Sequence, residues 1–282
     1  MTLFDRYIAV DWSAANTPRT GRDSIWIAES GRPSLNPPTR DEAMAIIRER
    51  LAEGGRVVLG FDFNFGYPRG AAEAITGVPR WDALWAEIAA HVIDGPDNSS
   101  NRFEVAAAFN RRLGADHYWG HPHQHRYADL APTKPGHGYV AVPERRLAEA
   151  LARSAQPVWK LVGAGAVGSQ SLLGIARLEQ LRRDVPDVAV WPFETDFERR
   201  LAPITLVEIY PSLFPLTGQV LPRDREQVET CVMHFAALDA AGLLGKVLSA
   251  PADIDRTVLL AEEGWIAGVG HDLASRPQER AA

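Results

Sequence analysis

Short apolar runs alternate with amphipathic segments along most of the chain. Residues 6–11 and 23–29 predict strands joined by a polar, turn-rich stretch, which is typical of a hairpin. A capping box at residues 39–42 starts a helix that ends at the glycine pair 54–55, and residues 57–62 predict another buried strand. The order strand, strand, helix, strand predicts an α/β fold with a mixed sheet.

The middle of the chain is less regular. Residues 80–93 and 102–113 predict helices, whereas residues 114–142 show little periodicity. A long irregular segment inside a compact domain favours a functional or covering loop. We therefore expect one domain over residues 1–282, with a helical and loop-rich insertion near residues 80–150.

The second half of the chain regains the alternation of apolar runs and amphipathic segments. The expected strands cover residues 157–163, 187–193 and 204–211. The expected helices cover residues 169–184, 224–248 and 253–262.

The composition is that of a globular protein, with 46% hydrophobic and 23% charged residues. No apolar run approaches the length of a membrane span, and no export signal is evident, so we expect a cytoplasmic protein. Cys231 is the single cysteine, which excludes an internal disulfide or a cysteine-based zinc site. The net charge of −6 gives no evident long-range field for nucleic acid.

Four acidic residues occupy positions where a lone charge is unfavourable. Asp11, Asp62 and Glu208 close or nearly close predicted strands, and Asp239 lies in an apolar stretch of a predicted helix. Burial of an unpaired carboxylate is costly, so each acid needs a partner. A divalent cation such as Mg²⁺ or Mn²⁺ would neutralise several of them at once and could support phosphodiester hydrolysis. Pairing of each acid with a separate Arg or Lys, or a capping role, is the structural alternative.

Several motifs carry a resemblance to a known family. YIAVDWSAAN, VVLGFDFNFGYP, LVEIYPSLFPL, HFAALDAAGLL and EEGWIAGV resemble a family of uncharacterised bacterial proteins predicted to be nucleases with an RNase H-like fold. The resemblance implies a mixed central sheet flanked by helices. It also implies that an acid on the first strand, one on a later central strand and one on the final helix bind metal, which match Asp11, Asp62 and Asp239.

The resemblance extends to a function. It implies metal-dependent hydrolysis of phosphodiesters with Mg²⁺ or Mn²⁺, with Glu208 as a fourth ligand or as the base that orients water. The substrate would be nucleic acid or a small phosphoester. Some relatives look like proteins of molybdopterin or cobalamin biosynthesis, so the alternative is a non-hydrolytic accessory protein that binds a nucleotide or pterin.

A glycine run offers a second candidate site. The stretch LVGAGAVGSQSLLG has G-x-G-x-x-G spacing between a predicted strand and a predicted helix. Backbone N–H groups at such a helix start can hold a phosphate, with Lys160, Gly165 and Ser169 nearby. A dinucleotide site is less favoured because the motif lies late in the chain and the next acid is too distant. A tight turn without a ligand is the simplest interpretation.

The stretch HYWGHPHQH concentrates histidines in the irregular segment. In an extended conformation His121 and His123 share one face, which allows a metal site or a contact with substrate. The alternative is a polar loop that lies over the active cleft.

Overall fold

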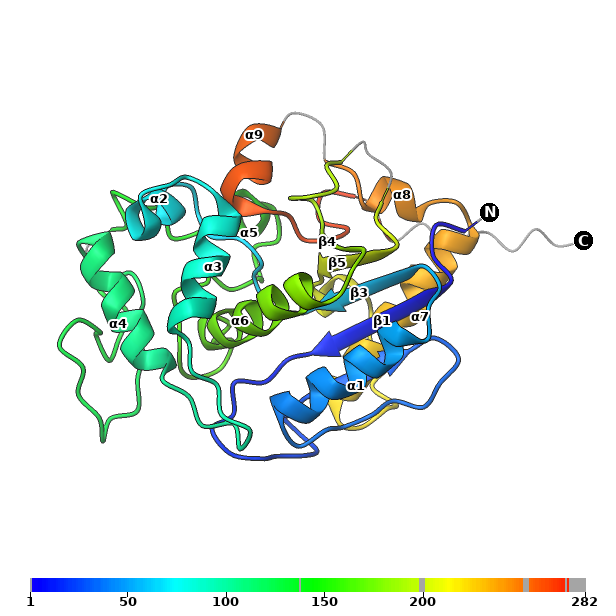
Figure 1. Cartoon of the computed structure of the whole chain (residues 1–282), viewed down its shortest axis with the longest axis horizontal. Helices are drawn as coiled ribbons and strands as arrows, with labels where there is room; N and C mark the ends of the chain where they lie inside the picture. Colours follow the sequence, from blue (N-terminus) through cyan, green and yellow to red (C-terminus); the bar gives the residue numbers. More distant parts are fainter. Residues whose placement is uncertain (1, 137, 198–200, 251–253, 272, 274–282) are drawn as a thin grey trace, which may run out of the picture.

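A five-stranded mixed sheet forms the centre of the protein in the computed structural model, which describes residues 2–136, 138–197, 201–250, 254–271 and 273 (Figure 1). The strand order is β2-β1-β3-β5-β4, and only β2 is antiparallel to its neighbour. The strands are β1 (Arg6–Asp11), β2 (Trp26–Glu29), β3 (Val57–Phe61), β4 (Val188–Val190) and β5 (Ile204–Glu208). The prediction of a mixed sheet opened by a hairpin is confirmed.

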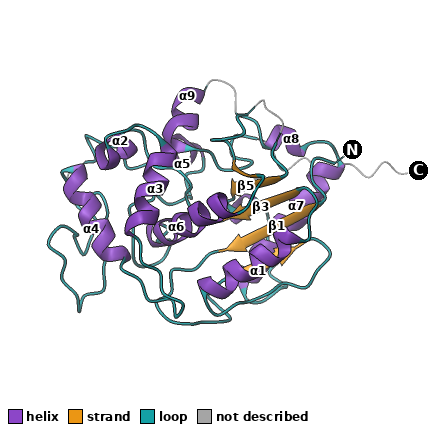
Figure 2. Cartoon of the chain, viewed as in Figure 1, coloured by secondary structure: helices purple, strands orange, loops and turns teal. Residues whose placement is uncertain are grey.

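Helices cover both faces of the sheet, as Figure 2 shows. The helices α1 (Arg40–Ala52) and α6 (Gly168–Asp184) share a core with Val10 and Phe61, whereas α7 (Arg223–Ala240) packs with Ala9 and Val58 on the opposite face. Side chains alternate between the faces of a strand, so neighbouring strand residues serve different cores. This alternation decides which strand-end acids can meet.

The capping box before α1 forms as the sequence predicts. The hydroxyl oxygen of Thr39 accepts a hydrogen bond from the Glu42 N–H at 3.1 Å, which satisfies one of the free donors at the helix start. The helix then buries Ala43 and Ile47 against the sheet.

A second group of helices lies beside α6, away from the sheet (left in Figure 1). It consists of α2 (Ala71–Thr76), α3 (Trp81–His91) and α4 (Arg102–Leu113), with the short α5 (Leu147–Leu151) nearby. Helix α3 packs directly on α6. The expected helices near residues 80–93 and 102–113 are therefore present, and long loops follow α4.

Four expectations about local structure need correction. Residues 157–163 form no strand of the sheet, because Lys160 only bridges Trp119 at one position. The helix expected over 224–248 ends at Ala240, since Gly242 adopts a left-handed conformation with φ of 70°, and α8 (Leu244–Val247) follows.

The end of the chain also departs from the expected helix over 253–262. The described part contains α9 (Arg256–Val258) and a π-helical turn, η2 (Leu259–Glu263), while residue 253 lies outside the described residues. The expected strand over 204–211 ends at Glu208, where the short helix η1 (Pro211–Leu213) soon begins. No helix in the described ranges combines the length and apolarity that crossing a membrane requires.

Candidate functional site

Asp11 and Asp62 lie side by side at the carboxyl edge of the sheet. Val10 pairs with Phe61 in the parallel ladder of β1 and β3. Asp11 follows Val10 and Asp62 follows Phe61, so the two aspartates are neighbours across the ladder. The Trp12 N–H donates to the Asp62 carboxylate at 2.7 Å. By strand alternation both side chains belong to the face that α7 covers.

The two aspartates open into a cleft of about 540 Å³. The cleft is also lined by Trp12, Ser13, Asp23, residues 163–166, Gln170 and Asp224. Asp11 and Asp62 are each partly exposed there, so solvent and small ions reach them.

Helix α7 contributes a third acid, Asp224, from its first turn. The backbone N–H of Asp23, in the loop of the β1–β2 hairpin, donates to Asp224 Oδ2 at 2.6 Å. This bond connects the hairpin loop to the start of α7 and fixes Asp224 at the rim of the cleft. The cleft therefore combines acids from four chain segments.

Burial and neighbouring carboxylates raise the pKa values of Asp11 and Asp62. Burial raises the pKa of Asp62 to about 7, with a smaller contribution from Asp224, although the Trp12 N–H opposes the shift. Burial and the charge of Asp62 raise the pKa of Asp11 well above its usual range. Within the described part of the chain, neither carboxylate has an ion pair with Lys or Arg. The two carboxyls therefore lie together without a cationic side chain from the described residues to balance them when they ionise.

The donor set suits a hard divalent cation, but it is not a ready-made metal cluster. No three His, Cys, Asp or Glu side chains of the described residues converge closely enough to hold an ion. Mg²⁺ commonly binds one or two carboxylates and completes its coordination with water and substrate phosphates. The adjacent carboxylates of Asp11 and Asp62, which pair with no Lys or Arg in the described ranges, fit that mode of binding.

Glu208 does not join the aspartates, which corrects the expected four-acid site. It pairs with Phe61 in the β3–β5 ladder, one position before Asp62, so its side chain points to the other face of the sheet. There the buried guanidinium of Arg146 donates to Glu208 Oε2 at 2.8 Å and also binds Glu149. Burial raises the pKa of Glu208, and Arg146 opposes the rise. Glu208 is a structural acid in a buried ion-pair network.

The placement of Asp239 with Asp11 and Asp62 is also wrong. The Asp239 carboxylate accepts hydrogen bonds from the Leu3 N–H at 2.8 Å and the Tyr7 hydroxyl at 2.7 Å, at the opposite end of β1. Asp224 and Asp239 both lie on the side of α7 that faces the sheet, but a helix rises 1.5 Å per residue, so about 22 Å separates them. Asp239 anchors the chain start instead.

The glycine run reaches the cleft, but only part of it faces a ligand. Residues 163–166, including Gly165, line the same cleft as the two aspartates. Ser169 is buried and its hydroxyl donates to the Leu161 carbonyl at 2.8 Å, and Lys160 donates to the Ala164 carbonyl. These two residues stabilise the turn. A dinucleotide fingerprint is excluded by the missing strand before the motif.

The histidines do not line the cleft. His121 is buried and its Nδ1 lies 3.0 Å from the Pro122 carbonyl oxygen, and its ring packs on Tyr127. His123 is exposed. The shared face expected for His121 and His123 is therefore not formed, because one side chain is buried and the other points to solvent.

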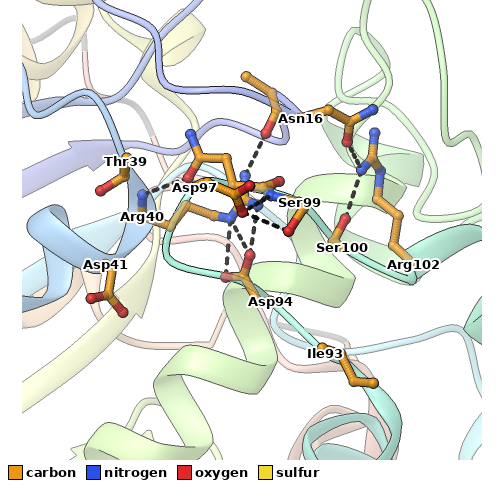
Figure 3. Close-up of polar contacts among 12 residues, drawn as sticks. Asn16, Thr39, Arg40, Asp41, Ile93, Asp94, Asp97, Ser99, Ser100 and Arg102 are labelled. Atoms are coloured by element: carbon orange, nitrogen blue, oxygen red, sulfur yellow. Dashed lines mark hydrogen bonds and ion pairs between the residues drawn. The ribbon is translucent and has the colours of Figure 1, made fainter.

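Two buried arginines hold the loop that follows Asp11 (Figure 3). The Arg40 guanidinium donates to the carbonyl oxygens of Ser13 and Ala15 and binds Asp94 at 2.6 Å. Arg102 donates to the side-chain oxygen of Asn16. Because Arg40 is fully buried, its charge must be balanced, and Asp94 supplies that balance. The network fixes the cleft wall next to Asp11.

Sequence reasoning missed Asp224 and Asp23. The sequence does contain a pattern that indicates Asp224. Asp224, Val228 and Cys231 have the spacing of one helix face, and Asp239 lies on the same face. The acid at the start of this face enters the cleft, and the acid at its end does not. Asp23 has no such signal, because its position depends on the hairpin loop.

Comparisons of the chain with protein-family models, with curated proteins and with solved structures found no match.

Proposed function

We propose that the protein is a hydrolase of phosphodiesters that depends on a divalent cation, with its active site at the Asp11–Asp62 cleft. The observation that carries this proposal is the pair of adjacent carboxylates at the ends of β1 and β3, open to solvent and without a cationic side chain among the described residues. A functional site is where such unfavourable charge is retained, because a purely structural site would pair it.

The resemblance to RNase H-like nucleases supports the proposal. In those proteins acids on the first strand, on a later central strand and on the final helix bind the metals. Asp11 and Asp62 match the first two positions, and Asp224 lies on the same helix as Asp239, which the resemblance implies for the third. The mixed sheet flanked by helices is compatible with an RNase H-like fold. We include that fold in the proposal.

The four acids of the cleft and Trp12 have roles in the proposed reaction. Asp11 and Asp62 would hold Mg²⁺ or Mn²⁺, which supplies positive charge for a phosphoryl oxygen and acidifies a bound water. The Trp12 N–H orients the Asp62 carboxylate. Asp224, fixed by the Asp23 N–H, lies at the rim and would orient the attacking water.

A non-hydrolytic role in nucleotide binding is the second candidate. It is favoured by the turn at residues 163–166, whose backbone lines the same cleft. Both candidates place a phosphate near this turn, but only the hydrolase needs Asp11 for turnover.

Hydrolysis of bis(p-nitrophenyl) phosphate tests the proposal. The wild type should release p-nitrophenol with Mn²⁺ or Mg²⁺ and not in EDTA. Asp11→Asn should lose at least ~100-fold in rate, because a bound metal ion contributes several kcal/mol of transition-state stabilisation and each ~1.4 kcal/mol is tenfold in rate. Asp184→Asn, a half-exposed carboxylate at the far end of α6, is the matched control and should retain the rate. No hydrolysis by the wild type, or equal rates for Asp11→Asn, would overturn the assignment.

A further inference from the structure

Two further cavities continue from the aspartate cleft along the start of α7. The first, of about 800 Å³, shares Asp23 and Asp224 with the cleft and adds Arg22, Arg223 and Leu221. The second, of about 490 Å³, shares Leu221 and Arg223 with the first. The three cavities therefore adjoin one another along the start of α7, and we refer to them together as the groove.

The middle of the groove carries positive charge that the fold does not use. The Arg22 side chain is 84% exposed and only its Nε approaches Asp23, at 3.7 Å. Arg223 is exposed and forms no ion pair with another described residue. The two exposed arginines can each bind a phosphate, and Asp23 and Asp224 line the same cavity.

The far part of the groove is mainly apolar. Leu221 is 79% exposed there, and Leu216 and Val220 continue the apolar lining. Exposed apolar surface next to arginines suits a ligand that alternates charged and flat apolar groups. Small phosphoesters would fill only the aspartate cleft.

We propose that the groove binds a single-stranded nucleic acid. Arg22 and Arg223 hold phosphates next to the scissile one, and Leu221 contacts an unpaired base. This inference rests on the proposed function, because it takes the Asp11–Asp62 cleft as the position of the scissile phosphate. A small phosphoester explains neither the length of the groove nor its arginines. Duplex would bury its bases away from Leu221.

The carboxylates of Asp23 and Asp224 lie between the cleft and the arginines and repel phosphate. The contribution of the arginines to binding is therefore measured as a difference in affinity between proteins that all retain Asp23 and Asp224. An assay in EDTA also separates binding from hydrolysis, since the proposed hydrolysis needs a divalent cation.

Fluorescence anisotropy with labelled oligo-dT and oligo-U in EDTA tests the inference on the full chain. The double variant Arg22→Gln/Arg223→Gln should bind about tenfold more weakly than the wild type. For this double variant, the slope of log K against log[salt] should be shallower by about 1.4. Two phosphate contacts are lost, and each contributes about 0.7 to the slope on single strands. Arg80→Gln/Arg153→Gln removes the same charge from exposed sites outside the groove and should match the wild type.

The results separate the two proposals. No binding by the wild type, equal affinities for both double variants, or an unchanged salt dependence would overturn the groove as a nucleic-acid site. A duplex that binds better than either single strand would also overturn it. The hydrolase proposal is tested by a different measurement, the turnover of bis(p-nitrophenyl) phosphate by the wild type and by Asp11→Asn.

Discussion

Asp62→Asn should stabilise the protein at alkaline pH while it disables the site. The substitution removes a negative charge beside Asp11 and retains an oxygen that accepts the Trp12 N–H. The folded-state pKa of Asp62 is raised to about 7 from 3.8, so the folded protein holds a proton that the unfolded chain has lost. The contribution of this bound proton to the free energy of unfolding is fully present below pH 4. It is lost as the pH rises through 7.

The magnitude follows from the same pKa. Each pKa unit corresponds to about 1.36 kcal/mol, so the rise from 3.8 to about 7 sets an upper limit of about 4 kcal/mol at pH 8. The cleft is open to water, which screens the repulsion, and we expect about half of that limit, about 2 kcal/mol. For a chain of this size the melting temperature Tm should rise by about 4 °C.

Thermal unfolding in EDTA at pH 4 and pH 8 measures the effect. Asp62→Asn should melt about 4 °C above the wild type at pH 8 and close to it at pH 4, where the wild-type carboxyl is already protonated. Asp184→Asn, whose partner is Arg48, should change little at pH 8. A lower Tm for Asp62→Asn at pH 8 would mean that a cationic group compensates Asp62, and the reasoning about uncompensated charge would be refuted.

Three substitutions elsewhere should destabilise the fold, and urea unfolding measures each. Asp239→Asn should cost about 2 kcal/mol, because an amide cannot accept from the Leu3 N–H and the Tyr7 hydroxyl as a carboxylate does; an unchanged midpoint would contradict its anchoring role. Arg146→Met should cost about 3–5 kcal/mol, since it leaves buried carboxylates without a cation. Gly168→Ala should cost about 1–3 kcal/mol, because a Cβ would lie 2.2 Å from the Val158 carbonyl oxygen; wild-type stability would show that this contact relaxes freely.

The central part of the fold was predictable from local patterns. The strand at residues 6–11 and the helix at 102–113 agree with the observed bounds, because apolar periodicity and end signals coincide there. The segment 157–163 looks like a strand for the same reason. It is buried beside Trp119 in the loop region, and burial alone does not place an apolar run in the sheet.

The site was predictable in part. Asp11 and Asp62 are identified because each comes at the end of a buried apolar run that predicts a strand. The two strands are parallel neighbours in the sheet, which brings their ends together. Glu208 ends a neighbouring strand too, but a difference of one position in register places it on the opposite face, and register depends on pairing that one sequence does not reveal. Asp239 and Asp224 share a helix face, and only the direction of α7 against β1 decides which one enters the cleft.

The most direct test of the account is calorimetric titration of Mn²⁺ into the wild type and Asp11→Asn at pH 7.5. The account predicts binding to the wild type that releases protons, because carboxyls with raised pKa values must ionise to bind the ion. It predicts at least tenfold weaker binding to Asp11→Asn, as for loss of one coordinating carboxylate. Absence of binding to the wild type, or equal affinity in both proteins, would contradict a cation site at Asp11 and Asp62.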